Sequence, residues 1–259
     1  MKATILAAAL LAAGVLCADP AEPRIKVALA GSSGCQTYRS GDPKLIWGWG
    51  EVIGQYFTPN VTVLNFAVSG QSTWSFRDKG SWAKLLASKP DYIFMTLGAN
   101  DTPGKEFATD AQTTFRENLR RYAAEAEAAG AKIIFVTLNQ SLRGNKKTNK
   151  AMFIKGRALR RDRVPYSQAI REVAAELHKP CLELFDNQQK ILEAMGEEAA
   201  GKLYRLKPDG VIDGSHTNKA GAELLAKIII SELRKSDSPL KEFTVDPKLE
   251  IPAASPEAK

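Results

Sequence analysis

A short apolar segment that ends in a glycine-serine turn is the feature that most constrains this chain. Residues 25–30 (IKVALA) are mostly apolar, and Gly31-Ser32-Ser33-Gly34 ends the run. Such a run is typical of a central strand of a parallel sheet, which is buried on both faces. Ligands bind at the carboxyl ends of the strands in open sheets of this kind. We therefore expect Ser32 and Ser33 to lie on a loop at that edge, and Ser33 is the candidate nucleophile.

Further apolar runs alternate with helical patterns along the rest of the chain. The expected strands cover residues 61–66, 92–97, 132–138 and 181–185. The expected helices cover residues 47–57, 81–87, 111–129, 166–178, 187–195 and 218–233. Strands alternating with helices predict one five-stranded parallel sheet with helices on both faces, which is a three-layer αβα sandwich. We assign this α/β domain to residues 19–236.

The two ends of the chain differ in composition from this domain. Residues 1–18 combine one lysine, an apolar run and small residues, which predicts a signal peptide cleaved after Ala18 and a secreted or periplasmic protein. Cys17 leaves lipid anchoring open as an alternative, although Leu16 is bulky where a small residue is expected. Residues 237–259 are proline-rich and aperiodic, so we expect an extended or mobile tail.

Cysteine usage and charge limit the cofactors and partners. Cys35 follows the first expected strand, whereas Cys181 begins the last one, at the opposite edge of the sheet, so we expect two unpaired thiols. The chain has no CxxC motif and no cluster of His, Cys and carboxylates, so no metal site is expected. The net charge of +7 suits an acidic partner or solubility alone. We expect a monomer without a stable membrane span, and no nucleic-acid motif is present.

Only one of the two histidines is placed to act on a serine. His216 follows Asp213 by three residues, just before the last expected helix. An aspartate so placed on a turn can hold the imidazole Nδ1 and stabilise the imidazolium, as serine hydrolysis requires. The alternative is that Asp213 only shapes the turn. His178 ends a helix at the opposite edge of the sheet, where a solvated side chain is expected.

Three groups could bind the oxyanion of an acyl-transfer intermediate. They are the backbone N–H groups of Ser33 and Gly70 and the side-chain amide of Asn100, each of which follows a different expected strand. Taken singly, Gly70 and Asn100 are ordinary turn residues. Their common position at one edge of the sheet favours an oxyanion hole.

The motifs at these positions resemble those of a known family, the SGNH/GDSL hydrolases, and within it the rhamnogalacturonan acetylesterase-like carbohydrate esterases. The matching blocks are Gly31-Ser32-Ser33, Gly70 within NFAVSGQSTWSF, Gly98-Ala99-Asn100-Asp101, and Asp213–His216 continuing as SHTNKAGAELLA. The resemblance extends from about residue 25 to residue 236.

The resemblance implies roles for these residues. Ser33 would be the nucleophile, His216 the base and Asp213 the residue that orients it. Ser33, Gly70 and Asn100 would form the oxyanion hole. The family has a flavodoxin-like αβα sheet and uses no cofactor.

Two positions depart from the family pattern. Ser32 replaces the aspartate that usually precedes the nucleophile, which puts the geometry of the first loop in question and adds a second hydroxyl. Ala99 stands where acetylesterase relatives often carry histidine, which bears on how the substrate fits.

A basic segment and one tryptophan suggest how a substrate is bound. Residues 143–163 carry nine Lys or Arg against one Asp. We expect Arg143, Lys146 and Lys147 to form a rim that attracts an anionic polysaccharide, with a solvated helix surface as the alternative. Trp74 follows the second loop and could stack on a sugar ring.

The sequence thus predicts a secreted serine esterase that removes acetyl groups from a plant-type polysaccharide. Within enzymes, the alternatives are another O-acylated glycan or a small ester. A non-catalytic carbohydrate-binding protein is a second class, favoured only by Ser32. A flavodoxin-type phosphate site would explain the glycine-serine turn but not Asp213 and His216.

Overall fold

Five parallel strands form the central sheet of the computed structural model, which describes residues 24–144, 151–153 and 156–250. The strands are β1 (Ile25–Gly31), β2 (Val61–Asn65), β3 (Tyr92–Thr96), β4 (Lys132–Val136) and β7 (Cys181–Leu182). They lie in the order β2-β1-β3-β4-β7, and every neighbouring pair is parallel. The predicted five-stranded parallel sheet is confirmed.

Strand β1 lies inside the sheet and is buried on both faces. Because successive side chains of a strand point to opposite faces, Ile25, Val27 and Leu29 enter one hydrophobic cluster. Ala28 and Ala30 enter a second cluster on the other face. The apolar run of β1 therefore supplies both cores and fixes where the turn at Ser32 emerges.

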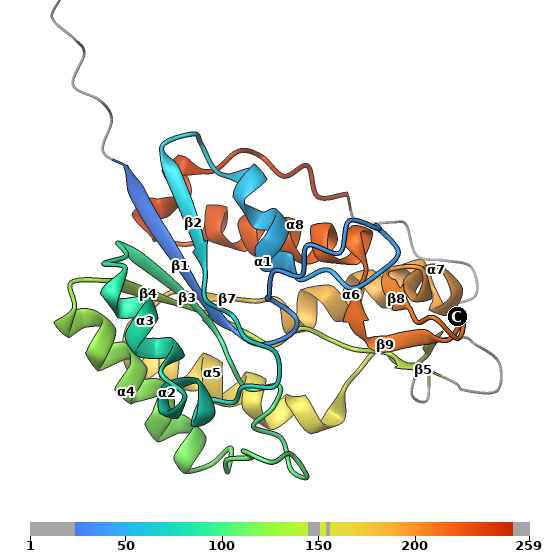
Figure 1. Ribbon diagram of the computed structural model, residues 1–259, viewed down its shortest axis with the longest axis horizontal. Coiled ribbons are helices and arrows are strands. Elements are labelled where there is room, and N and C mark those ends of the chain that lie inside the picture. The colour runs from blue at the N-terminus through green and yellow to red at the C-terminus, as the bar shows by residue number, and fades with distance from the viewer. Residues whose placement is uncertain (1–23, 145–150, 154–155, 251–259) are drawn as a thin grey trace, which may run out of the picture.

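Helices cover both faces of this sheet, which confirms the three-layer αβα sandwich (Figure 1). One face is covered by α1 (Trp49–Val52) and α8 (Lys219–Lys235). The other face is covered by α2 (Ser75–Asp78), α3 (Ser81–Ala87), α4 (Thr114–Ala128) and α5 (Val164–Glu176). No helix of the described residues is long and apolar enough to cross a membrane.

Smaller elements lie beside the sheet, where Figure 1 shows α6 (Phe185–Met195), α7 (Glu197–Gly201) and β9 (Ile212–Thr217) together. Strand β9 pairs antiparallel with β8 (Tyr204–Leu206), and β5 (Arg143–Gly144) pairs antiparallel with β6 (Ala151–Met152). Three 3-10 helices complete the described elements: η1 (Ile53–Tyr56), η2 (Arg161–Arg163) and η3 (Pro239–Phe243).

The position of Asp213 and His216 corrects the expectation from sequence. We expected these residues on a loop, but they lie on β9. The pairing of β8 with β9 shifts register between Tyr204 and Arg205, and such an irregularity re-aims the side chains beside it. A strand of mixed polar residues, IDGSHT, has no apolar alternation that would reveal it.

Two elements are shorter than expected. The helix expected over residues 47–57 begins only at Trp49, because Gly48 keeps an extended backbone (φ −94°, ψ 147°), and its second half is the 3-10 helix η1. The strand expected over residues 181–185 ends at Leu182. The N–H groups of Leu184 and Phe185 donate instead to the Thr137 hydroxyl, where α6 begins.

The segment after Ser236, expected to be extended or mobile, is packed on the domain as far as Glu250. Helix η3 buries Leu240 completely. The Thr58 N–H donates to Phe243 O at 2.9 Å, and the Val245 N–H donates to Tyr56 O at 2.8 Å. Residues 251–259 lie outside the described residues, as do the expected signal peptide (residues 1–18) and Cys17.

Both described cysteines are free thiols. Cys35 is buried just after β1, whereas Cys181 begins β7. Strands β3 and β4 separate β1 from β7. Neighbouring strands are about 4.8 Å apart, so this separation exceeds the roughly 7 Å that a disulfide spans between Cα atoms.

Candidate active site

The loop that follows β1, residues 32–38 (the serine loop), holds Ser33 on a tight turn. The Ser32 carbonyl accepts hydrogen bonds from the N–H groups of Cys35 and Gln36 at 2.9 and 3.0 Å. Ser32 is only 5% exposed, whereas Ser33 is partly exposed. Of the two hydroxyls, that of Ser33 is therefore the more accessible.

Ser32 replaces the expected aspartate, and an asparagine from β2 orders the serine loop. The Asn65 side-chain amide donates to Cys35 O at 2.8 Å and to the Thr37 hydroxyl at 2.9 Å. Its carbonyl oxygen accepts from the Ala67 N–H at 3.0 Å. Asn65 thus ties the serine loop to the next loop without a carboxylate.

Asp213 and His216 form a hydrogen-bonded pair on β9. His216 Nδ1 lies 2.9 Å from Asp213 Oδ2, and the Ser215 N–H donates to Asp213 Oδ1 at 2.9 Å. Burial raises the pKa of Asp213, but these hydrogen bonds, with the charges of His216 and Arg205, outweigh burial and lower the pKa to about 2. An ionised Asp213 holds the proton on Nδ1, which leaves Nε2 free to accept one.

Arg205 is a site residue that sequence reasoning missed. Its guanidinium lies 2.8 Å from Asp213 Oδ2, the same oxygen that faces His216. Arg205 is on β8 and reaches Asp213 because the two strands pair in the shifted register. No local motif links these two positions, so the contact could not be predicted from the sequence.

The serine loop and β9 both contact the segment that leads into α1, where the Trp49 N–H donates to Gly34 O at 3.0 Å. The Tyr38 hydroxyl donates to Ser33 O at 3.0 Å. Burial raises the pKa of this phenol, and the charge of Arg205 offsets part of the rise. The Trp47 N–H donates to Thr217 O at 2.9 Å, beside His216.

The reactive atoms themselves are unpartnered. Within the described part of the chain, neither the Ser33 hydroxyl nor His216 Nε2 has a hydrogen-bond partner. Catalytic hydrogen bonds are often long or absent without substrate and tighten when it binds.

The loop after β2, residues 66–74 (the β2 loop), places Gly70 beside the serine loop. The Gln36 side-chain oxygen accepts from the Ser69 N–H at 2.5 Å. Gly70 has a left-handed backbone (φ +79°), which glycine adopts without strain. Among the described residues, no acceptor faces the N–H of Gly70 or of Ser33. Both donors are available for an oxyanion.

Asn100 and Asp101, after β3, hold the β2 loop in place. Asn100 Nδ2 donates to Gln71 O at 3.1 Å, and its second proton remains available. The Asp101 carboxylate accepts from the Thr73 N–H at 3.0 Å and from the Thr109 hydroxyl at 2.8 Å. Burial raises the pKa of Asp101, and these bonds lower it only in part, to about 6.

Asn139 is a second residue that the sequence did not single out. It follows β4, and a Cβ on Gly34 would lie only 2.9 Å from Asn139 Oδ1. The Asn139 carbonyl accepts from the buried Arg163 at 2.6 Å. The Asn139 side chain thus packs directly against the serine loop.

The expected substrate-binding residues have different outcomes. Trp74 is 47% exposed and stacks on Phe107, with ring centroids 5.4 Å apart. Arg143 lies on β5, but its side chain is not described, and Lys146 and Lys147 lie outside the described residues. His178 lies at the opposite edge of the sheet, beside the first residues of β3 and β4, as expected.

The arrangement suits acyl transfer by a serine. It offers a hydroxyl, an imidazole held by a carboxylate, and three donors at the same edge of the sheet. In the described ranges, no three His, Cys, Asp or Glu side chains are grouped to hold a metal ion.

Several known proteins are similar to this chain in sequence and fold. Rhamnogalacturonan acetylesterase RhgT from Bacillus subtilis (strain 168) is 30% identical over 208 residues, which cover 76% of this chain and 85% of that protein. The solved structure of YxiM from Bacillus subtilis has a TM-score of 0.66 and 27% identity, covering 82% of this chain. This chain spans just over half, 56%, of that structure.

A more distant structure shares the fold, and a family model matches the chain. Axe2, an acetylxylan esterase from Geobacillus stearothermophilus, has a TM-score of 0.57 and 19% identity, covering 82% of this chain and 94% of that one. The model of the GDSL-like lipase/acylhydrolase family matches residues 30–224, from the end of β1 into α8. The chain therefore belongs to the GDSL-like lipase/acylhydrolase family and is a carboxylic ester hydrolase.

Proposed function

We propose that this protein is a secreted serine esterase that removes O-acetyl groups from a polysaccharide, and that the polysaccharide is a pectin of the rhamnogalacturonan type. The relative RhgT, a rhamnogalacturonan acetylesterase, supports the substrate. The apolar, small-residue segment at residues 1–18 supports export.

The pair of Asp213 and His216 carries this proposal. Its Nδ1–Oδ2 distance of 2.9 Å fixes the imidazole with Nε2 unpartnered, as a general base requires. In the first step, Ser33 Oγ attacks the acetyl carbonyl carbon while Nε2 takes the hydroxyl proton. Asp213 stabilises the imidazolium without being protonated itself, consistent with its low pKa.

The oxyanion donors act on the tetrahedral intermediate. Its negative oxygen accepts hydrogen bonds from the N–H groups of Ser33 and Gly70 and from Asn100 Nδ2. The intermediate collapses when His216 returns the proton to the departing sugar oxygen, which leaves an acetyl ester on Ser33. A water molecule, deprotonated by His216, then attacks this ester, and His216 returns the proton to Ser33 Oγ as acetate leaves.

The basic segment completes the proposal for an acidic polymer. Arg143, Lys146 and Lys147 would attract uronate groups of the polysaccharide. Replacing all three by Gln should raise KM on an acidic polymer much more than on a small neutral ester. Equal effects on both substrates would show that the segment is only a charged surface.

The decisive experiment compares the protein without residues 1–18 with its Ser33→Ala and Ser32→Ala variants. We expect p-nitrophenyl acetate hydrolysis to be lost in Ser33→Ala and kept in Ser32→Ala. Acetate release from acetylated rhamnogalacturonan and from acetylated xylan then tests the polymer. Loss only in Ser32→Ala, or no acetate release from any ester, would refute the assignment.

A further inference from the structure

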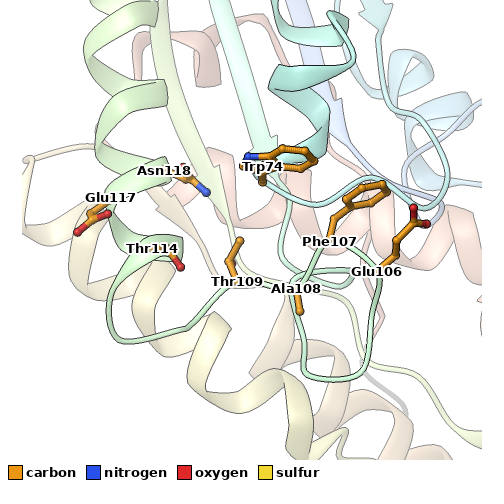
Figure 2. A pocket seen from close by; sticks show the side chains of 8 residues that line it. All are labelled: Trp74, Glu106, Phe107, Ala108, Thr109, Thr114, Glu117 and Asn118. Atoms are coloured by element: carbon orange, nitrogen blue, oxygen red, sulfur yellow. The ribbon is translucent and has the colours of Figure 1, made fainter.

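A cavity of about 550 Å³ opens beside the β2 loop and is not used by the catalytic steps above. Figure 2 shows it between Trp74, the loop that carries Phe107, and α4. Its eight lining residues include two aromatic side chains, two carboxylates and several hydroxyl or amide groups. This combination of one apolar face with polar side chains is typical of a small-molecule site.

The aromatic side of the cavity is a rigid pair. Trp74 and Phe107 stack with centroids 5.4 Å apart and an interplanar angle of 23°. Lys79 Nζ lies 4.2 Å from the centre of the Phe107 ring and helps to hold it. Trp74 is nevertheless 47% exposed, among the most exposed large apolar side chains described. An exposed, pre-positioned indole is suited to bind the apolar face of a ring.

The polar side of the cavity keeps unused hydrogen-bonding groups. Asn118 Nδ2 donates to the Thr73 hydroxyl at 3.0 Å, which fixes the amide and leaves its carbonyl oxygen free to accept. The Thr114 hydroxyl accepts from the Asp110 N–H at 2.9 Å and can still donate. A sugar presents hydroxyl groups of both kinds around an apolar ring face, so it matches this lining.

The charge of the cavity restricts which sugar fits. Glu106 and Glu117 both line it and are exposed, and none of the lining residues is Lys or Arg. A uronate carboxylate would meet these two like charges, with only Lys79, above the Phe107 ring, to offset them, whereas an uncharged sugar would meet no repulsion. This environment is opposite in sign to the basic segment 143–163.

The cavity belongs to the same edge of the sheet as the catalytic residues. Trp74 is four residues after Gly70, a stretch that spans at most about 14 Å. Thr73, between them, is fixed by Asp101, the neighbour of Asn100. A chain of a few sugars could therefore occupy the cavity while one of its acetyl groups lies at Ser33.

We propose that this cavity is a subsite for an uncharged sugar residue of the same polysaccharide, stacked on Trp74 and hydrogen-bonded to Asn118 and Thr114. The inference rests on the proposed polysaccharide esterase function. It adds the kind of sugar residue of the polysaccharide that binds away from the reacting ester. In a polymer that alternates charged and neutral sugars, the neutral one occupies this cavity.

Binding to the Ser33→Ala protein tests the subsite apart from catalysis. The probe is an uncharged acetylated xylo-oligosaccharide, titrated by calorimetry. Trp74→Ala and Phe107→Ala should each raise Kd by about tenfold or more, whereas Trp74→Phe should recover most of the affinity. Val245→Ala, which removes an exposed apolar side chain elsewhere, is the matched control and should change Kd by less than about twofold.

A second arm tests the charge. An acetylated oligosaccharide of rhamnogalacturonan, which carries uronate groups, should bind the Glu106→Gln/Glu117→Gln variant about threefold or more tightly than the parent, with a smaller change for the uncharged probe. Equal affinities in parent and variant for both probes would overturn the preference for an uncharged sugar. Unchanged Kd values in Trp74→Ala and Phe107→Ala, or no saccharide binding at all, would overturn the subsite.

The subsite and the esterase can fail separately. Acetate release that depends on Ser33, with saccharide affinity independent of Trp74, would leave the esterase and remove the subsite. Saccharide binding that depends on Trp74, without acetate release by the parent protein, would support the subsite and refute the esterase activity.

Discussion

His216 Nδ1 lies 2.9 Å from Asp213 Oδ2, and a single carboxylate oxygen thereby orients the imidazole. The other oxygen, Oδ1, accepts the Ser215 N–H at 2.9 Å, so the carboxylate cannot rotate freely. The side chain of Asp213 is only 10% exposed, against 28% for His216. The imidazole is therefore held at Nδ1 by a buried, fixed carboxylate, and its Nε2 points away from Asp213.

Replacing this anion tests its role. Asp213→Asn should lower kcat for p-nitrophenyl acetate by roughly 10³–10⁴-fold, because an amide can donate to Nδ1 and leave the proton on Nε2. The free energy of unfolding should change far less than kcat does. Rates and urea denaturation measured on the same preparation check both. A kcat within about tenfold of the parent would show that His216 does not need the carboxylate.

Arg205 shares Asp213 Oδ2 with His216, which predicts an effect on pH dependence. Arg205→Met removes one of the charges that lower the pKa of Asp213, so this pKa should rise from about 2 toward its ordinary value. Activity near pH 7 should then fall by less than about tenfold, with a larger loss toward pH 4. The profile of kcat/KM from pH 4 to 8 measures this, and Arg205→Lys is the control that keeps the charge.

Some residues of the candidate site could be predicted from the sequence, whereas the contact between Arg205 and Asp213 could not. Ser33, Gly70 and Asn100 each follow an apolar run, and parallel strands bring their carboxyl ends to one edge, so their position was predictable. Arg205 reaches Asp213 only through a two-stranded ladder with an irregular register. That pairing depends on tertiary packing, and no sequence period encodes it.

Asp101 carries a prediction about stability. Its pKa is raised to about 6 by burial, so between about pH 4 and 6 the folded protein binds a proton that the unfolded chain has lost. The free energy of unfolding should therefore fall through this window as pH rises, with a contribution of ~3 kcal/mol from this group. Asp101→Asn should remove that decline.

Urea denaturation of parent and Asp101→Asn protein from pH 4 to 7 measures this contribution as a difference. The control is Asp110→Asn. Hydrogen bonds from the Gln112 N–H and the Thr113 side chain lower the pKa of Asp110, so its contribution is lost as pH falls rather than as it rises. Parallel pH curves for parent and Asp101→Asn would contradict the prediction.

Gly48 explains why the helix expected from residue 47 begins only at Trp49. Gly48 lies within an apolar helical pattern, but its backbone closely approaches the backbone of the serine loop. A Cβ at Gly48 would lie 2.2 Å from Gln36 O, in the serine loop. The sequence does not show that Gly48 and the serine loop are neighbours. The apolar pattern alone therefore predicted a helix that includes Gly48.

Gly48→Ala should therefore displace the serine loop. We expect a loss of about 3 kcal/mol or more in the free energy of unfolding, together with loss of esterase activity. Gly54→Ala is the matched control, since the nearest atom to its Cβ would be Val63 Cγ2 at 3.8 Å. Denaturation midpoints and kcat should be near those of the parent in the control. Two variants of equal stability would rule out the close backbone contact.

Leu240 tests whether the carboxyl-terminal segment is part of the domain. The composition of residues 237–259 predicts an extended tail, because the segment is rich in proline and has no helical or strand period. In the structure Leu240 is fully buried in the cluster that α8 and β1 share, and Ser238 caps the short helix around it. Leu240→Ala should cost about 2–5 kcal/mol of unfolding free energy, whereas Val245→Ala, at an exposed position of the same segment, should cost little. A Leu240→Ala protein as stable as the Val245→Ala protein would mean that the segment does not pack on the domain.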